Sequence, residues 1–175
     1  MEPEQDREVG DSRGGEAEVT TSGTLSLVIF RLGERWYALP TAGVKEVAEV
    51  GPIRSIPQRS SEVLLGLINL RGVLYLCVSL DGLLGESGEA SRTRVENSRG
   101  SARLVVVENE RERWVFPANE VSGVFHFLPK EIQTVPTRLT DDEALPIKGI
   151  VSWQERSVSY VDEKVLFNTL KGRIS

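Results

Sequence analysis

Cysteine and histidine each occur once in the 175 residues, at Cys77 and His126. A single cysteine excludes a disulfide within the chain, and its apolar neighbours favour a buried side chain rather than a nucleophile. One histidine far in sequence from one cysteine shows no recognisable metal-site spacing. No phosphate loop, dinucleotide fingerprint or Gly-x-Ser-x-Gly elbow occurs either. We therefore expect a binding protein without a metal or cofactor, and not an enzyme.

Excess positive charge and long hydrophobic runs are also absent. The formal net charge is 21 − 26 = −5. Residues 1–23 hold seven acids and two bases, which is also −5, so the remainder is neutral. This balance argues against a nucleic-acid partner. No apolar run approaches the roughly 20 residues of a membrane span, and no apolar signal core begins the chain, so we expect a cytoplasmic protein.

Residues 1–23 are acidic, rich in Gly and Glu, and contain no aromatic side chain. Such a segment buries too little apolar surface to offset the entropy of ordering it. We expect a disordered acidic tail over 1–23, followed by one folded domain over 24–175.

Alternating apolar residues and turn signals predict strands through the first half of the folded part. The run Val44–Val50 fits neither the helical nor the strand period cleanly, and we favour a strand preceded by a helical turn at Thr41–Lys45. A short helical turn follows at 81–84, with Asp81 as its cap. The predicted strands are Leu25–Leu32, Arg35–Pro40, Val44–Val50 and the two arms of Gly66–Leu80.

The stretch Gly66–Leu80 predicts a hairpin, because two apolar runs flank the polar pair Arg71–Gly72. Glycine reaches positive φ easily, as a tight reversal requires. A guanidinium held on a rigid turn can fork onto a carboxylate of a partner. Two other interpretations stay open, an exposed turn arginine and an internal role in which Arg71 braces the inter-barrel region through hydrogen bonds.

A polar break at Glu86–Ser101 is followed by a repetition of the first-half pattern. The repetition predicts an internal duplication, in which Trp114 matches Trp36 at an offset of 78 and Gly149 matches Gly66 at 83. Each unit alone is marginal in size, so we expect the two to share a core. The fold class is therefore all-β, with two five-stranded units at about 24–85 and 102–161.

A short C-terminal helix is predicted over 162–171, with Asp162 as N-cap and Gly172 just beyond its end. Val165, Leu166, Thr169 and Leu170 form one apolar face, with Phe167 at its margin. We expect this face to pack on the strands.

Two motifs resemble the CheW family of bacterial chemosensory coupling proteins. They are Val-x-Glu-Val at 44–47 and Gly-Leu-Ile-Asn-Leu-Arg-Gly at 66–72, and the resemblance extends over about Thr24–Lys171. It implies two SH3-like five-stranded barrels sharing a core, with no catalysis. It also implies a scaffold that joins the cytoplasmic tips of chemoreceptors to the regulatory domain of a CheA-type histidine kinase, recruited to receptor arrays. The candidate partner-binding residues are Val44, Glu46, Val47, Asn69, Arg71 and Gly72.

The sequence departs from the usual family pattern at Leu76, where many members have proline, and at Ser79, where many have aspartate. Its second half resembles the variant found in alternative chemosensory systems, some of which control gene regulation or cyclic-dinucleotide synthesis. Two other functions stay open, the regulatory part of a histidine kinase or receiver fusion and a double barrel that binds a small ligand. The chain has no phosphoacceptor histidine or ATP-binding segment, which favours a free-standing coupling protein.

Overall fold

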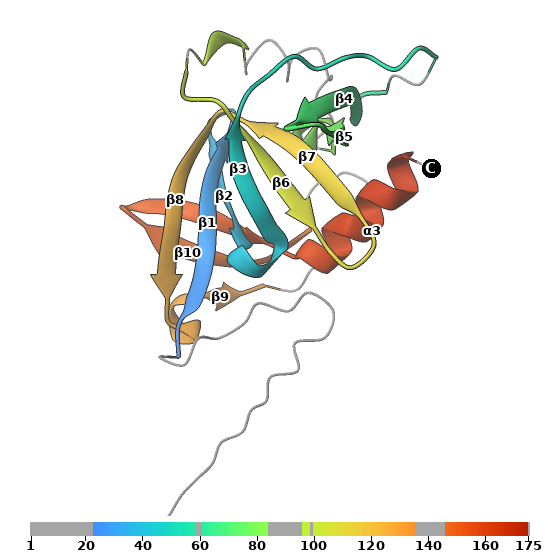
Figure 1. Cartoon of the computed structure of the whole chain (residues 1–175). Coiled ribbons are helices and arrows are strands. Elements are labelled where there is room, and N and C mark those ends of the chain that lie inside the picture. Colours follow the sequence, from blue (N-terminus) through green and yellow to red (C-terminus); the bar gives the residue numbers. More distant parts are fainter. Residues whose placement is uncertain (1–22, 59–60, 84–95, 99, 136–145, 175) are drawn as a thin grey trace, which may run out of the picture.

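The computed structural model describes residues 23–58, 61–83, 96–98, 100–135 and 146–174. The expected acidic tail, most of the polar break and the loop after residue 135 lie outside these residues. Within them the chain is almost entirely β, with one longer helix near the C-terminus (Figure 1). The elements are β1 Leu25–Leu32, β2 Arg35–Pro40, the 3-10 turn η1 Thr41–Gly43, β3 Val44–Glu49, β4 Leu64–Leu70, β5 Val73–Val78, α1 Leu80–Leu83, β6 Arg103–Glu108, β7 Arg113–Ala118, β8 Glu120–Phe127, η2 Pro129–Glu131, β9 Gln133–Thr134, β10 Ile147–Trp153, β11 Arg156–Val161 and α3 Glu163–Ile174.

The strands form two sheets, and each sheet takes strands from both halves of the chain. One has the order β8-β1-β2-β11-β10-β9, and the other has the order β3-β6-β7-β5-β4. The expected units at 24–85 and 102–161 are therefore wrong as sheet boundaries. The first hairpin of each half joins the sheet of the other half through parallel pairs, β2 with β11 and β7 with β5. Such pairings join residues far apart in sequence, so local strand patterns do not reveal them.

The duplication itself is visible residue by residue in the strand register. Val47 pairs with Val105, and Val124 pairs with Val28, so both partners are displaced by 77 residues (124 − 47 and 105 − 28). The β4–β5 and β10–β11 hairpins match at 83, because Gly66 pairs with Cys77 and Gly149 with Tyr160. The predicted duplication is thus consistent with the structure.

The expected match of Trp36 with Trp114 is wrong by one residue. Leu27 pairs with Pro40 and Leu104 with Pro117, an offset of 77, so the counterpart of Trp114 in the first half is Tyr37 and not Trp36. A slip of one residue sends a strand side chain to the other face of its sheet. Accordingly Trp114 is buried in the core between the sheets, whereas Trp36 packs on a separate cluster within the first sheet.

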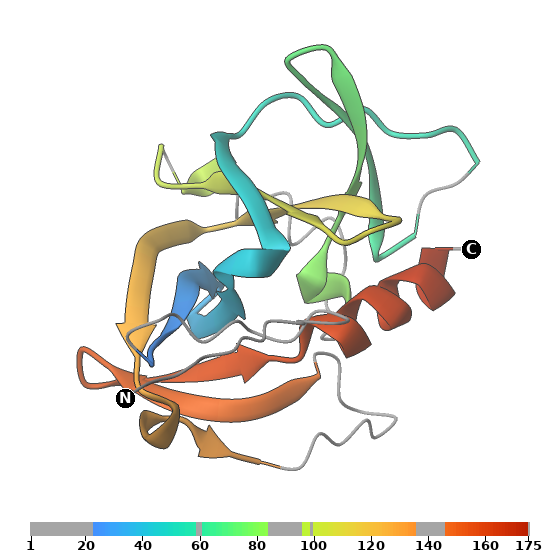
Figure 2. The ribbon, with the colours of Figure 1, turned by 60° about the horizontal axis from the view of Figure 1, so that its bottom comes forward.

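The largest hydrophobic cluster lies between the two sheets and includes side chains from both of them and from α3. Figure 2 shows α3 running beside the two sheets. Two smaller clusters are built mainly from the strands of one sheet each. The shared core predicted from the size of the units is confirmed. Its fully buried members include Phe30, Leu39, Phe116, Leu166 and Leu170.

The helix caps agree only in part with the sequence interpretation. Asp162 caps α3 as expected, since its Oδ1 accepts a hydrogen bond from the N–H of Val165 at 3.3 Å. The helix does not end before Gly172 but continues to Ile174, and Phe167 is buried rather than marginal. At α1 the cap is Ser79, whose Oγ accepts from the N–H of Gly82 at 3.0 Å, and not Asp81.

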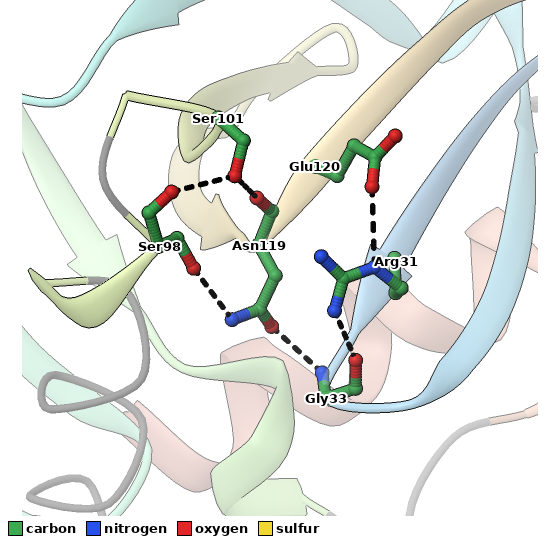
Figure 3. A network of polar contacts seen from close by, with 6 residues as sticks. All are labelled: Arg31, Gly33, Ser98, Ser101, Asn119 and Glu120. Atoms are coloured by element: carbon green, nitrogen blue, oxygen red, sulfur yellow. Dashed lines mark hydrogen bonds and ion pairs between the residues drawn. The ribbon is translucent and has the colours of Figure 1, made fainter.

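A polar network around Asn119 joins segments that lie far apart in sequence (Figure 3). The Asn119 side chain is buried; its Oδ1 accepts from the N–H of Gly33 at 2.7 Å, and its Nδ2 donates to Ser98 at 3.1 Å. Arg31 donates to the carbonyl of Gly33 and also pairs with Glu120. The network holds the β1–β2 turn against the corner between β7 and β8.

Candidate functional site

The β4–β5 turn has the geometry that its sequence demands. Arg71 and Gly72 both have positive φ, 52° and 85°, as in the two-residue turns that match the twist of a hairpin. Asn69 stabilises the turn, because its Oδ1 accepts a hydrogen bond from the N–H of Gly72 at 2.8 Å. The predicted hairpin is confirmed, and Arg71 projects from a rigid point on it.

Arg71 forms a two-pronged ion pair with Glu46 on β3, 25 residues away in sequence. Nη1 donates to Oε2 at 3.0 Å and Nη2 donates to Oε1 at 2.6 Å. The hydrogen bond between Arg71 and Glu46 lowers the pKa of Glu46 and raises the pKa of Arg71. The Arg71 side chain remains 73% exposed. Arg71 thus forms an ion pair within its own sheet while its guanidinium stays accessible to another molecule, and contact with a partner remains a prediction.

The ion pair also connects the two edges of one sheet. β3 and β4 are the outermost strands of the five-stranded sheet, and Arg71 follows β4 directly. Glu46 and Arg71 therefore join the two edges, so this end of the sheet closes toward a barrel. A rigid, partly closed barrel end presents a defined surface to a partner.

Exposed apolar side chains belong to the same elements as the ion pair. Among the described residues six large hydrophobic side chains are exposed, and four of them come from β3, the residue after it and β5. These four are Val47 (40%), Val50 (38%), Val73 (44%) and Leu74 (64%). We call Glu46, Arg71 and these four residues the ion-pair surface, because they belong to the strands that the ion pair joins and the residues next to them; Glu46 and Val47 are neighbours on β3 and point to opposite sides of the sheet. Strands that carry both an accessible charged pair and exposed apolar side chains are candidates for a protein-docking site.

The six predicted site residues do not all lie on this surface. Glu46, Val47 and Arg71 do, and Asn69 and Gly72 shape the turn below it. Val44 instead packs against the core between the sheets and is half-buried. The sequence interpretation missed Val73 and Leu74 because they begin the apolar run 73–78. Alternation alone could not have signalled the exposure of both, because adjacent strand residues point to opposite sides of a sheet.

The second half repeats the backbone of this site but lacks the residues of the ion pair. Gln154 and Glu155 occupy the turn equivalent to Arg71 and Gly72, with φ of 49° and 61°. Gly123 stands at the position equivalent to Glu46, so no corresponding ion pair forms. The ion pair is therefore specific to one of the two sheets, whereas the exposed Val47 has an exposed counterpart in Val124.

Two barrel-like sheets around a shared core, with a docking-type surface at one end, define a duplicated β module. This description agrees with the relatives of the chain. The scaffolding protein TtCheW from Thermoanaerobacter tengcongensis superposes with a TM-score of 0.66 at 22% identity, over 91% of this chain and 94% of that one. A probable chemotaxis protein CheW of Rhizobium etli is 25% identical over 148 residues, 83% of this chain and 89% of the relative.

The chemotaxis protein CheW of Rhizobium meliloti is 24% identical over 152 residues, 86% of this chain and 92% of the relative. The family model of the CheW-like domain matches residues 26–171. The chain belongs to the CheW-like domain family, and the resemblance read from its two motifs is confirmed.

Two searches of the described residues bear on other kinds of site. No group of three or more His, Cys, Asp or Glu side chains is arranged to hold a metal ion there. Within the same residues, none of the helices combines the length and apolar character needed to cross a membrane.

Proposed function

We propose that this chain is a scaffold of a bacterial chemosensory system that couples chemoreceptors to a CheA-type histidine kinase. Membership of the CheW-like family and the scaffolding and chemotaxis relatives support this coupling role. In this proposal the ion-pair surface docks the CheW-like regulatory domain of the kinase, and the groove between the two barrels receives the receptor tip. The chain works by binding, without catalysis, in the cytoplasm at receptor arrays.

The observation that carries the docking proposal is the accessible ion pair of Glu46 and Arg71, at two strands of a sheet whose elements also expose apolar side chains. Apolar area removed from water supplies the driving force of association, at about 25 cal/mol per Å² before its costs. The exposed guanidinium of Arg71 retains donors that can fix the orientation of a partner. Because the pair is already formed, its side chains lose little further entropy on docking.

The test is a binding titration with the regulatory domain of the kinase encoded in the same genome. Arg71→Glu places two carboxylates side by side and should weaken binding at least tenfold, which corresponds to about 1.4 kcal/mol. Leu74→Asp, which leaves the ion pair intact, should have a comparable effect because it charges the apolar rim. Gln154→Glu is the matched control, since it adds a carboxylate at the equivalent turn of the other sheet. Unchanged binding of both test variants would exclude this surface.

The alternative of a small-ligand module is less well supported. A ligand site between the barrels would need a polar, enclosed space, whereas the described region between the sheets is filled by apolar side chains of the shared cluster. Which receptor and kinase the chain serves, and whether the output is motility, gene regulation or cyclic-dinucleotide synthesis, is a matter for a pull-down from the native cell.

A further inference from the structure

A buried carboxyl group lies against the turn that leads into the ion-pair surface. Glu163 is the first residue of α3, and only 5% of it is exposed. Its carboxyl group contacts Gly43, the last residue of η1, so closely that a Cβ atom added to Gly43 would overlap with Oε2 of Glu163. A larger residue at 43 would therefore displace the Glu163 carboxyl group, the flexible end of its side chain.

The Glu163 carboxyl group has no compensating partner in the described part of the chain, neither a hydrogen bond nor an ion pair within 4 Å. Lys148 of β10 is the nearest source of opposite charge outside α3, and its Nζ lies over the ring of Tyr160 at 4.8 Å. Asp162 and Lys164 add charges of opposite sign beside it. The facing turn, η1, consists of Thr, Ala and Gly and brings no titratable group. The Glu163 oxygens are not among the fully buried polar atoms that lack a hydrogen bond in the described residues, so the carboxyl group touches water while most of the side chain is buried.

The environment of Glu163 favours its neutral form. Burial raises the pKa of Glu163 to about 7, against the smaller opposing influence of Lys148. Burial and the nearby charge of Glu163 also raise the pKa of Tyr160 to about 12. Near neutral pH the Glu163 carboxyl group is therefore present in both forms.

The backbone that Glu163 contacts continues directly into the candidate site. Gly43 is followed by Val44, the first residue of β3, and Glu46 and Val47 are the third and fourth residues after Gly43. A neutral carboxyl group can remain packed against Gly43, whereas a carboxylate gains by turning toward water. That rearrangement removes the support of η1 and shifts the start of β3.

We propose that Glu163 positions the β3 edge through Gly43, so that docking at the ion-pair surface is tighter when Glu163 is protonated. The proposal rests on the proposed docking function, and it adds a regulation by pH of that same surface. α3 and β3 then act as one unit, whose arrangement shifts with the occupancy of a single proton.

The first test uses the full chain alone and follows backbone amide signals by NMR from pH 5.5 to 8.5. The amides of Glu46 and Val47 should shift with the same midpoint as the Glu163 carboxyl carbon. In Glu163→Gln they should stay at their low-pH positions throughout. Glu110→Gln, at an exposed loop carboxyl, is the matched control and should titrate like wild type.

The second test measures the dissociation constant for the kinase regulatory domain at pH 6 and pH 8.5. The dissociation constant of wild type should rise from pH 6 to pH 8.5 about fivefold more than that of Glu163→Gln, a factor within the usual range for linked sites. Any change shown by Glu163→Gln reports the pH response of the partner, since this variant has no carboxyl group at 163. Gly43→Ala, which displaces the side chain at any pH, should bind as wild type does at pH 8.5.

The proposal is overturned if the β3 amides ignore pH in wild type, or if they move equally in Glu163→Gln. It is also overturned if wild type and Glu163→Gln show the same pH dependence of binding while Arg71→Glu abolishes binding. If instead Arg71→Glu leaves binding unchanged while the β3 amides follow Glu163, the positioning role stands and the docking function fails. The two failures are therefore distinguishable.

Discussion

The buried Glu163 gives a prediction about stability that needs no partner. Its pKa is about 7 in the folded chain against a reference of 4.5. Between these two pH values the folded chain retains a proton that the unfolded chain has released, so the free energy of unfolding falls as the pH rises through this window. Above pH 7 both states are ionised and the loss is complete. A difference of 2.5 pKa units corresponds to about 3 kcal/mol.

Glu163→Gln removes the ionisation and should reverse this loss. The uncharged amide keeps the shape of the carboxyl group but is buried without a partner, which costs about 1 kcal/mol. The variant should therefore be slightly less stable than wild type at pH 4.5 and about 2 kcal/mol more stable at pH 8.5. For a chain of this size that gain raises the Tm by roughly 5 °C.

The measurement is thermal and urea unfolding of both proteins at half-unit steps from pH 4.5 to 8.5. Groups common to both proteins contribute equally to both curves, so the difference between the two curves isolates Glu163. Glu110→Gln should give a curve parallel to wild type. A difference between wild type and Glu163→Gln that does not change with pH would refute the reasoning, because it would mean that Glu163 titrates alike in the folded and unfolded chain.

Three further substitutions test the packing that supports the site, each by urea denaturation. Gly66→Ala should cost more than about 2 kcal/mol, since Gly66 has φ of 147° and a Cβ there would overlap with the carbonyl oxygen of Arg54. Gly72→Ala, with open space around it, should cost only about 1 kcal/mol. Equal costs of the two substitutions would contradict the clash at Gly66. Leu170→Ala should cost about 2–5 kcal/mol because the side chain is fully buried between α3 and the sheets, and a cost below 1 kcal/mol would argue against the shared core. Asn69→Ala should cost about 1 kcal/mol through loss of its hydrogen bond to the turn and also weaken kinase binding, which an unaltered dissociation constant would disprove.

Local features of the candidate site were predictable from the sequence. The Arg71–Gly72 pair predicted a tight hairpin, and its positive φ values confirm the turn. The motif at 44–47 placed Glu46 on a strand, as β3 shows. What could not be predicted was that Glu46 and Arg71 bind each other, since a carboxylate and a guanidinium 25 residues apart have many alternative partners. Their meeting depends on two strands that are not neighbours within the sheet.

The sequence by itself determined the strands, the hairpins, the duplication and the family, because turns and alternation act over a few residues. Only the tertiary structure decided which hairpin joins which sheet, since β1 and β2 pair with β8 and β11 across long separations. It also decided the register that separates Trp36 from Trp114. The near-neutral pKa of Glu163 has the same origin. A side chain at a helix start looks exposed in the sequence, and it is buried here because η1 crosses between the sheets against it.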